Sequence, residues 1–240
     1  MKNEARPVKY SLVAPLFNEA GNIPALLAQL RPVMDSLGAP YEVLLVNDGS
    51  TDETQRLLDE AAGKWSQLRP IHFANNTGQA GALLHGLREA AGEWILTMDA
   101  DGQHDPADFR ALLAETAHAE LVVGIRHPRS DSWLRRAMSQ IANKVRARVL
   151  GDQVLDSGCG LKVMHRTVVP VLWPLRTLYS FIPAMAVHAG FRVSQVRVKH
   201  LPRRHGRSSY GLSVFLWRPA VDMLALWWLF RRTIRMPRRN

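Results

Sequence analysis

The sequence has 240 residues, of which 47% are hydrophobic and 22% are charged. This composition is typical of a folded globular protein and excludes wholesale disorder. A single cysteine, Cys159, excludes an internal disulfide and a four-cysteine zinc site. The 31 Lys and Arg residues outnumber the 21 Asp and Glu residues, which gives a net charge of +10. Such a surface attracts anions: nucleic acid, anionic lipid or phosphorylated small molecules.

Strand-like and helix-like segments alternate along the first half of the sequence. Strands are predicted at residues 8–16, 41–46, 71–73, 93–98 and 121–125, and helices at 22–37, 50–65, 81–91 and 105–117. The second half is less regular, with a basic helix at 133–150, a loop and short strand within 155–165, two short helices within 167–189 and a strand at 191–199. This order predicts an α/β fold with a mostly parallel sheet flanked by helices. We expect one domain over residues 1–211 and an extension over 212–240.

Polar residues follow the predicted strands at the points where the strands end. Asn18 and Glu19 follow the first strand, Asn47 and Asp48 the second, Asn75 and Asn76 the third, Asp99 and Asp101 the fourth, and Arg126 the fifth. The carboxyl ends of parallel strands meet at one edge of a sheet, and α/β proteins bind their ligands outside that edge. The sequence therefore predicts a binding site there.

The pair Asp99 and Asp101 indicates a metal site. Two carboxylates two residues apart at the end of a strand can reach one hard divalent cation, and Gln103 adds an amide oxygen. A metal at this place would neutralise a departing diphosphate. The alternative is a solvated turn, in which Asp and Gly are common. We favour the metal because the pair follows a buried strand within the ordered series of strand ends.

Two further acids are candidates for nucleotide contacts. Asp48 lies in the segment VNDGS, where a carboxylate can accept hydrogen bonds from a base or a ribose. The alternative is an Asx turn with a helix cap, but Ser50 is the better cap and leaves Asp48 free. For Glu19, in the segment PLFNE, the sequence leaves two roles open: a contact with the ribose, or an exposed acid before a helix.

Arginines gather in the second half of the sequence, and guanidinium groups match phosphate oxygens. The cluster comprises Arg126, Arg129, Arg135, Arg136, Arg203, Arg204 and Arg207. The alternative is a solvated basic face, which we prefer for Arg129 and Arg136. The sequence contains no GxGxxG, GxxxxGK[ST] or GxSxG motif, so it supports neither a dinucleotide fingerprint, a P-loop nor a nucleophile elbow.

In this order the motifs resemble those of family 2 glycosyltransferases of the GT-A fold. More narrowly, the chain resembles the dolichyl- and polyprenyl-phosphate sugar transferases, of which dolichol-phosphate mannosyltransferase is one type. The matching segments cover nearly the whole chain and are PLFNEAGNI, VNDGSTDET, NTGQAGALLHG, MDADGQHDP, VVGIR, WLRRAMS, DSGCGLKV and RRHGRSSYG.

This resemblance implies roles for the matching residues. The residues in contact with the nucleotide of a sugar donor would be Pro15, Asn18, Glu19, Asp48 and Asp99. The ligands of a divalent metal, Mg²⁺ or Mn²⁺, would be Asp99, Asp101 and Gln103. The catalytic residues would be Asp101, Arg126, Arg135, Ser139 and Arg203, of which the last four would hold donor and acceptor phosphates. The acceptor loop would contain Ser157 and Gly158.

Four positions depart from the pattern of the relatives. Asn47 replaces the first of two acids, so the part of that acid in base recognition does not carry over. Ser209 replaces a lysine, and one expected cation is therefore missing. Cys159 replaces an aromatic residue in the acceptor loop, and Gly102 replaces a leucine after the metal motif.

The implied activity is an inverting, metal-dependent transfer of a sugar from a nucleotide-diphosphate sugar to a polyprenyl phosphate. A phosphate acceptor is already anionic and needs no general base, and the Gln-x-x-Arg-Trp motif of processive synthases does not occur. One alternative is a family 2 transferase acting on a hydroxyl of a lipopolysaccharide or exopolysaccharide. Another is a basic module that binds membranes or nucleic acid, which the acids at the strand ends argue against. GDP-mannose, UDP-glucose and UDP-N-acetylglucosamine all stay open as donors, and so does the oligomeric state.

The apolar stretch at residues 212–230 is a candidate membrane element. Arg218 and Asp222 lie inside it, and each would cost about 2.5–3.5 kcal/mol near the centre of a bilayer. Tryptophans and a run of arginines, which favour an anionic membrane surface, occur in and after the stretch. We therefore expect an amphipathic helix that lies in the interface and holds the protein peripherally at the cytoplasmic face. The alternative is a C-terminal helix packed on the domain.

Overall fold

The computed structural model describes residues 7–127, 133–202 and 212–233. In the helices that begin at residues 133 and 212, side chains are described from Met138 and Trp217 onward. The strands are β1 (Tyr10–Leu16), β2 (Tyr41–Asn47), β3 (Leu68–His72), β4 (Trp94–Thr97), β5 (Leu121–Arg126), β6 (Lys162–His165) and β7 (Val193–Val198). The helices are α1 (Ile23–Asp35), α2 (Thr54–Ala62), α3 (Gln79–Glu89), α4 (Phe109–Ala114), α5 (Trp133–Leu150), α6 (Leu178–His188) and α7 (Leu212–Arg232), with 3₁₀ turns η1 (Pro106–Asp108), η2 (Glu115–Ala117) and η3 (Arg166–Val171).

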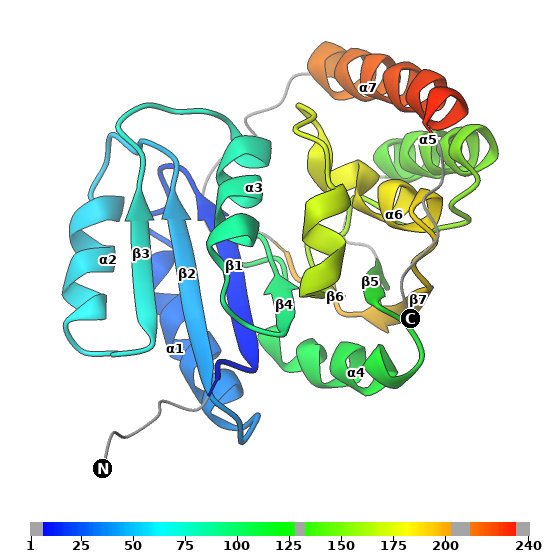
Figure 1. Cartoon of the computed structure of the whole chain (residues 1–240). Coiled ribbons are helices and arrows are strands. Elements are labelled where there is room, and N and C mark those ends of the chain that lie inside the picture. Colours follow the sequence, from blue (N-terminus) through cyan, green and yellow to red (C-terminus); the bar gives the residue numbers. More distant parts are fainter. Residues whose placement is uncertain (1–6, 128–132, 203–211, 234–240) are drawn as a thin grey trace.

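The strands form one mixed sheet in the order β3-β2-β1-β4-β6-β5-β7 (Figure 1). Every pair is parallel except those of β6, which runs antiparallel to both β4 and β5. The prediction of a mostly parallel sheet is thus confirmed, and β6 is the exception. Its direction follows from α5, which stays at the carboxyl end of the sheet in Figure 1 instead of crossing back. The chain therefore enters β6 from that end and runs in reverse.

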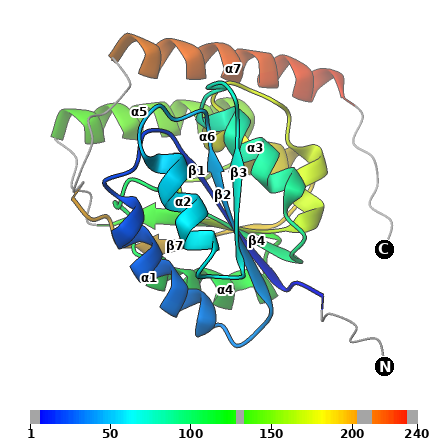
Figure 2. The same ribbon diagram turned by 90° about the vertical axis from the view of Figure 1, so that its left-hand side faces the viewer.

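Helices cover both faces of the sheet because successive strand residues point to opposite sides. On β1, Leu12 belongs to a core that also contains residues of α1, α2 and α4, whereas Val13 belongs to a core with residues of α3 and α6. Figure 2 shows α1 and α2 in front of the strands, with α4 below them. Helix α3 lies very close to the sheet, because a Cβ on Gly86 would be 2.5 Å from a methyl group of Val13.

The expected start of the second helix is wrong. Helix α2 begins at Thr54, not at residue 50. The Ser50 hydroxyl accepts a hydrogen bond from the Asn18 amide, 2.9 Å away, so it ties two loops together and caps no helix. At the start of α2 it is Asp52 that accepts a hydrogen bond, from the backbone amide of Thr54 to its Oδ1 atom at 3.0 Å. A long-range loop contact thus overrides the local capping pattern.

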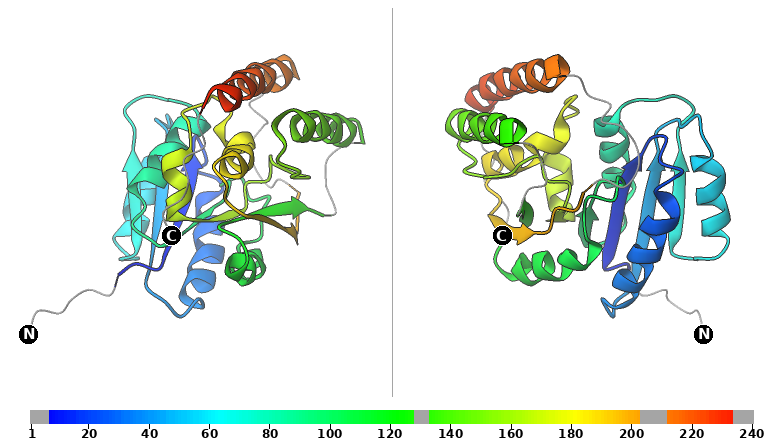
Figure 3. Two further views of the ribbon diagram at one scale, coloured as in Figure 1. Left: turned by 45° about the vertical axis from the view of Figure 1, so that its right-hand side comes forward. Right: turned by 180° about the vertical axis from the view of Figure 1, so that it is seen from behind.

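Helix α7 lies beside α5 (Figure 3) and also packs on α6. Leu226 is fully buried in this contact. The carboxylate of Asp222 accepts hydrogen bonds from the backbone amide and hydroxyl of Thr177 at the start of α6 (2.9 and 2.6 Å). Among the described residues, no helix combines the length and apolarity needed to cross a bilayer.

Candidate active site

The loops after β1 and β2 are joined by hydrogen bonds at the carboxyl edge of the sheet. The side-chain carbonyl of Asn18 accepts from the Thr51 amide at 2.8 Å, and Asn18 itself has a φ of 54°. The amide of Glu19 donates to the Thr54 hydroxyl at 3.0 Å. These contacts bring two of the predicted nucleotide residues, Asn18 and Glu19, next to the start of α2. Pro15 lies one residue before the end of β1.

Asp48 is almost fully buried and holds the loop that follows β3. Its Oδ1 atom accepts from the amide and hydroxyl of Thr77 (2.7 and 2.8 Å), and its Oδ2 atom accepts from the Gly78 amide (2.8 Å). A carboxylate offers about four acceptor sites, and partners among the described residues occupy three of them, which leaves one for a base or ribose. Gly49 allows the loop after β3 to pack closely against the loop after β2. It has a φ of +67°, and a Cβ there would lie 2.6 Å from the carbonyl carbon of Asn75.

Asn47, which departs from the pattern of the relatives, also orders this edge. It is buried, and its side-chain oxygen accepts from the Ser50 amide at 3.0 Å. Its amide nitrogen lies 3.1 Å from Nδ1 of His72, whose Nε2 lies 3.0 Å from Asp59. The residue therefore links β2, β3 and α2, and its polar atoms have partners within the protein.

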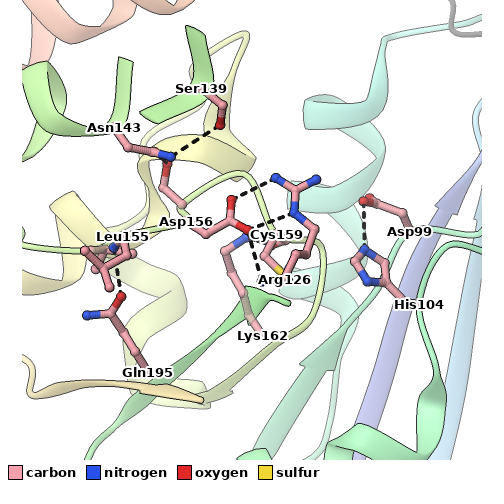
Figure 4. A network of polar contacts seen from close by, with 12 residues as sticks. Asp99, His104, Arg126, Ser139, Asn143, Leu155, Asp156, Cys159, Lys162 and Gln195 are labelled. Atoms are coloured by element: carbon pink, nitrogen blue, oxygen red, sulfur yellow. Dashed lines mark hydrogen bonds and ion pairs between the residues drawn. The ribbon is translucent and has the colours of Figure 1, made fainter. Parts of the chain in front are cut away.

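Asp99 follows β4 by two residues, and its carboxylate points toward His104 (Figure 4). Oδ1 accepts from Nε2 of Gln79 at 2.8 Å, and Oδ2 lies 3.5 Å from Nε2 of His104. Burial opposes ionisation of this carboxyl, but the His104 contact and the positive charges of Lys162 and Arg126 hold its pKa below the ordinary value. Asp99 is thus kept as a carboxylate at neutral pH.

The predicted metal ligands have the donor chemistry of a hard divalent cation. Asp101 follows Asp99 by two residues, and its Oδ1 atom accepts from the Gln103 amide at 3.1 Å. Two carboxylates and an amide side chain supply only oxygen ligands, which Mg²⁺ and Mn²⁺ accept. Within the described ranges, no three His, Cys, Asp or Glu side chains form a ready metal-binding group. A cation here would therefore need further oxygen ligands, such as those of a diphosphate.

Arg126 leaves the end of β5 and pairs with Asp156 of the predicted acceptor loop. Its Nε and Nη2 atoms donate to the two carboxylate oxygens, each at 2.8 Å, and its backbone amide adds a bond at 3.2 Å. Asp156 is buried, whereas Arg126 is only partly so. The pair fixes the plane of the guanidinium group.

The loop at residues 156–160 is also tied to α5. The hydroxyl of Ser157 donates to the side-chain oxygen of Asn143 at 3.2 Å. The side-chain amide nitrogen of Asn143 donates to the Ser139 hydroxyl at 3.5 Å. Arg146 donates to the same Asn143 oxygen at 2.7 Å and pairs with Asp152 in the buried interior. Two residues predicted for the site, Ser139 and Ser157, therefore share one partner. Gly158 lies near the Arg126 guanidinium, 3.6 Å from where its Cβ would be.

A buried lysine, Lys162, contacts this loop. Lys162 donates from Nζ to the carbonyl of Cys159. Burial lowers the pKa of the ammonium group, which the nearby carboxylates of Asp99 and Asp156 oppose. Burial disfavours the charged form of Cys159 as well, and it raises the pKa of this thiol to about 12. The cysteine is therefore a neutral packing group.

Several predicted residues fall outside the described part of the chain. The side chain of Arg135, in the first turn of α5, and the whole of Arg203 belong to this group, and so do Arg129 and Ser209. Their roles stay predictions. Conversely, sequence reasoning missed Gln79, His104, Asn143 and Lys162. Gln79 and His104 stand inside the quoted motifs, so their position was visible, but their contacts with Asp99 were not.

Solved structures share this fold. The glucosyl-3-phosphoglycerate synthase of Mycobacterium tuberculosis superposes with a TM-score of 0.69 at 19% identity, covering 92% of this chain and 80% of that one. Its complex with Mn²⁺, UDP-glucose and glycerol 3-phosphate gives a TM-score of 0.68 at 17% identity, with the same coverage. Sheet order, strand-end acids and these likenesses define an α/β fold of the GT-A type.

The chain belongs to glycosyl transferase family 2, which matches residues 11–173. It is 35% identical over 204 residues to the undecaprenyl-phosphate 4-deoxy-4-formamido-L-arabinose transferases of Aeromonas hydrophila and of Edwardsiella ictaluri. The alignment covers 84% of this chain and 63% of each relative, so the chain spans less than two thirds of their length. The family resemblance read from the motifs is confirmed, and the chain is a family 2 glycosyltransferase similar to the polyprenyl-phosphate sugar transferases.

Proposed function

We propose that this glycosyltransferase moves a sugar from a nucleotide-diphosphate sugar to a polyprenyl phosphate at a membrane surface, with inversion at the anomeric carbon. The observation that carries the proposal is the contact between the proposed acceptor loop and Asp99, the proposed metal ligand. A Cβ on Gly160 would lie 2.4 Å from Oδ2 of Asp99. An acceptor held by the loop at residues 156–160 would therefore stand beside the donor diphosphate. The names of the relatives, which contain undecaprenyl phosphate, support the choice of acceptor.

The donor would lie across the carboxyl edge. Pro15, Asn18, Glu19 and Asp48 would contact its nucleotide, as the loops after β1 and β2 meet there. Asp99, Asp101 and Gln103 would hold the divalent cation. The cation, Mg²⁺ or Mn²⁺, would neutralise charge on the leaving diphosphate. The M. tuberculosis enzyme has been crystallised with Mn²⁺ and a UDP-sugar, which supports the pairing of metal and nucleotide on this fold.

The proposed reaction requires no proton transfer to a side chain of the protein. An oxygen of the acceptor phosphate forms the new bond to the anomeric carbon while the bond from that carbon to the donor diphosphate breaks. Because the acceptor is already an anion, no general base is needed. Arg126 is oriented by Asp156 and would place a phosphate. Arg135, Ser139 and Arg203 would act with it, and Ser157 and Gly158 would line the acceptor path.

Attachment to the membrane is assigned to α7 together with α5. Trp217, Val221, Leu224 and Trp228 are exposed and recur at helical spacing on one stripe of α7, opposite the buried Leu226. Ile141 and Val145 are exposed on the neighbouring α5. Arg231 and Arg232 stack on Trp227 and Trp228, with guanidinium carbons 4.3 and 5.9 Å from the ring centroids. Apolar side chains rimmed by arginines suit an anionic lipid surface, which supports our proposal of peripheral binding at the cytoplasmic face.

A donor panel tests the function. The purified chain is mixed with vesicles containing undecaprenyl phosphate and, in turn, GDP-mannose, UDP-glucose, UDP-N-acetylglucosamine and a nucleotide-linked 4-deoxy-4-formamido-L-arabinose. Released nucleotide and lipid-linked sugar are measured. We expect one donor to react, EDTA to stop the reaction and Mn²⁺ or Mg²⁺ to restore it. Vesicles with undecaprenol, which has a hydroxyl in place of the phosphate, are the control. Transfer to saccharide hydroxyls without transfer to the lipid phosphate would contradict the proposal.

A further inference from the structure

The carboxylate of Asp99 is gripped from two directions by residues without an assigned role. Gln79, the first residue of α3, donates from its side-chain amide to Oδ1 at 2.8 Å. His104 approaches the other oxygen from the loop after β4, with Nε2 at 3.5 Å from Oδ2. The two contacts come from opposite ends of the carboxylate, so together they oppose its rotation about the Cβ–Cγ bond.

The surrounding packing leaves the imidazole little freedom to move. The side chain of His104 is 3% exposed. A Cβ on Gly160 would lie 2.9 Å from its Nε2 atom, so the loop backbone closes over the ring. That backbone is fixed in turn, because the carbonyl of Gly160 accepts from the Thr97 hydroxyl at 2.9 Å. The Nδ1 atom is buried and has no hydrogen-bond partner among the residues that the structure describes, a cost that a purely structural residue would avoid.

Gln79 is held just as firmly from the nucleotide side. The residue before it, Gly78, donates its amide to Asp48 at 2.8 Å. Asp48 thus fixes the start of α3, and the next residue reaches Asp99. The strand ends of β2 and β4, which do not neighbour each other in the sheet, are connected through this one turn of chain.

We propose that Gln79 and His104 are positioning residues that hold Asp99 in the orientation required to bind a divalent cation. The inference rests on the proposed function, which makes Asp99 a metal ligand. Partners that orient a metal-binding group typically change metal affinity about 10- to 100-fold when they are removed. Neither residue needs to touch the cation, and their effect should appear in metal binding before any chemistry takes place.

The test measures Mn²⁺ binding by electron paramagnetic resonance, with UDP or GDP present to complete the coordination. Gln79→Met removes the amide donor at nearly constant length, and His104→Phe removes both ring nitrogens. We expect each substitution to raise the Kd for Mn²⁺ about 10- to 100-fold. His104→Gln returns a donor and should recover most of the affinity. Matched controls are Gln55→Met and His118→Phe at exposed positions, which should bind Mn²⁺ as the wild type does.

The outcomes separate the inference from the function on which it rests. Wild-type affinity in folded Gln79→Met and His104→Phe variants would overturn the positioning role while leaving the metal site in place. A wild-type protein that binds no Mn²⁺ with either nucleotide would overturn the metal assignment and the inference with it. Circular dichroism and thermal unfolding identify any variant that fails to fold. If His104→Phe fails to fold, Gln79→Met and His104→Gln are each compared with the wild type. Wild-type affinity in folded Gln79→Met then contradicts a role for Gln79.

Discussion

Arg126 and Asp156 face each other in a bidentate ion pair, with both nitrogen–oxygen distances at 2.8 Å. The Asp156 side chain is buried, and the Arg126 side chain is 17% exposed. The arginine of the parallel strand β5 is thereby joined to the loop that leads into the antiparallel strand β6. A charge predicted to serve a substrate phosphate is also a structural clamp for the acceptor loop.

Asp156→Asn should therefore lower both stability and activity. Removing one partner of a buried pair leaves the other charge uncompensated, at a cost of about 3 kcal/mol. The free energy of unfolding in urea measures this loss. Glu60→Gln is the matched control, because Glu60 pairs with Arg56 on the exposed face of α2, where such pairs contribute about 0–1 kcal/mol. Equal losses in the two variants would show that the Arg126 pair does not clamp the loop.

Asp101→Ala should abolish sugar transfer and leave the fold intact. The side chain is a proposed metal ligand at the end of a strand, and its loss leaves one carboxylate where two are needed. Nucleotide release and thermal unfolding are measured together, with Glu60→Ala on the exposed face of α2 as the control. Full activity of Asp101→Ala, particularly in the presence of EDTA, would contradict the assignment of a metal-binding site to these residues.

Gly160→Ala should weaken Mn²⁺ binding more than it weakens the fold. The added methyl group would lie 2.4 Å from Oδ2 of Asp99, so the carboxylate must turn away. Gly63→Ala is the control, since Gly63 ends α2 with a φ of −62° and an added Cβ would have its nearest neighbour at 3.6 Å. If both variants bind Mn²⁺ like the wild type, the loop does not constrain Asp99.

The double substitution Arg231→Gln/Arg232→Gln should reduce binding to anionic vesicles. Each arginine near such a surface contributes about 1 kcal/mol, so the pair corresponds to roughly 30-fold in the partition coefficient. Vesicle sedimentation at low and high salt measures the effect, which salt should diminish. Lys64→Gln/Arg88→Gln removes the same charge from exposed positions on other elements. Identical losses in both double variants would indicate attraction by net charge alone.

Cys159 should resist alkylation in the native protein. Only the thiolate reacts, and burial raises the pKa of this thiol to about 12. At pH 8 the group is therefore almost entirely protonated as well as inaccessible. Iodoacetamide labelling followed by mass spectrometry should be slow in buffer and fast in concentrated urea. Rapid labelling of the native chain would show that the acceptor loop opens.

The sequence predicts β1, β2, β4 and β5 well because each is a short apolar run followed by polar residues. It predicts β3 poorly, at residues 71–73 instead of Leu68–His72, because that strand contains Arg69 and Pro70. The sequence also predicts the whole of α5, at residues 133–150. The place of β6 between β4 and β5 is not predictable in this way. Its four residues fix neither direction nor neighbours, which depend on where α5 ends.

The candidate site shows the same division. Asp99 and Asp101 are recognisable because both stand at one strand end. The partner of Asp99 on α3 is 20 residues away in the chain, and that of Ser157 on α5 is 14 residues away. Such contacts depend on how segments pack, and no local pattern encodes them.

The bond from the Thr97 hydroxyl to the Gly160 carbonyl has a consequence for engineering. It joins the strand that carries the acidic pair to the loop that would receive the acceptor, and β6 continues that loop in register with β4. A loop transplanted from a relative without its following strand would lose its anchor and disturb Asp99. Acceptor preference should therefore be exchanged as a cassette that includes β6, with Thr97 retained as its fixed attachment point.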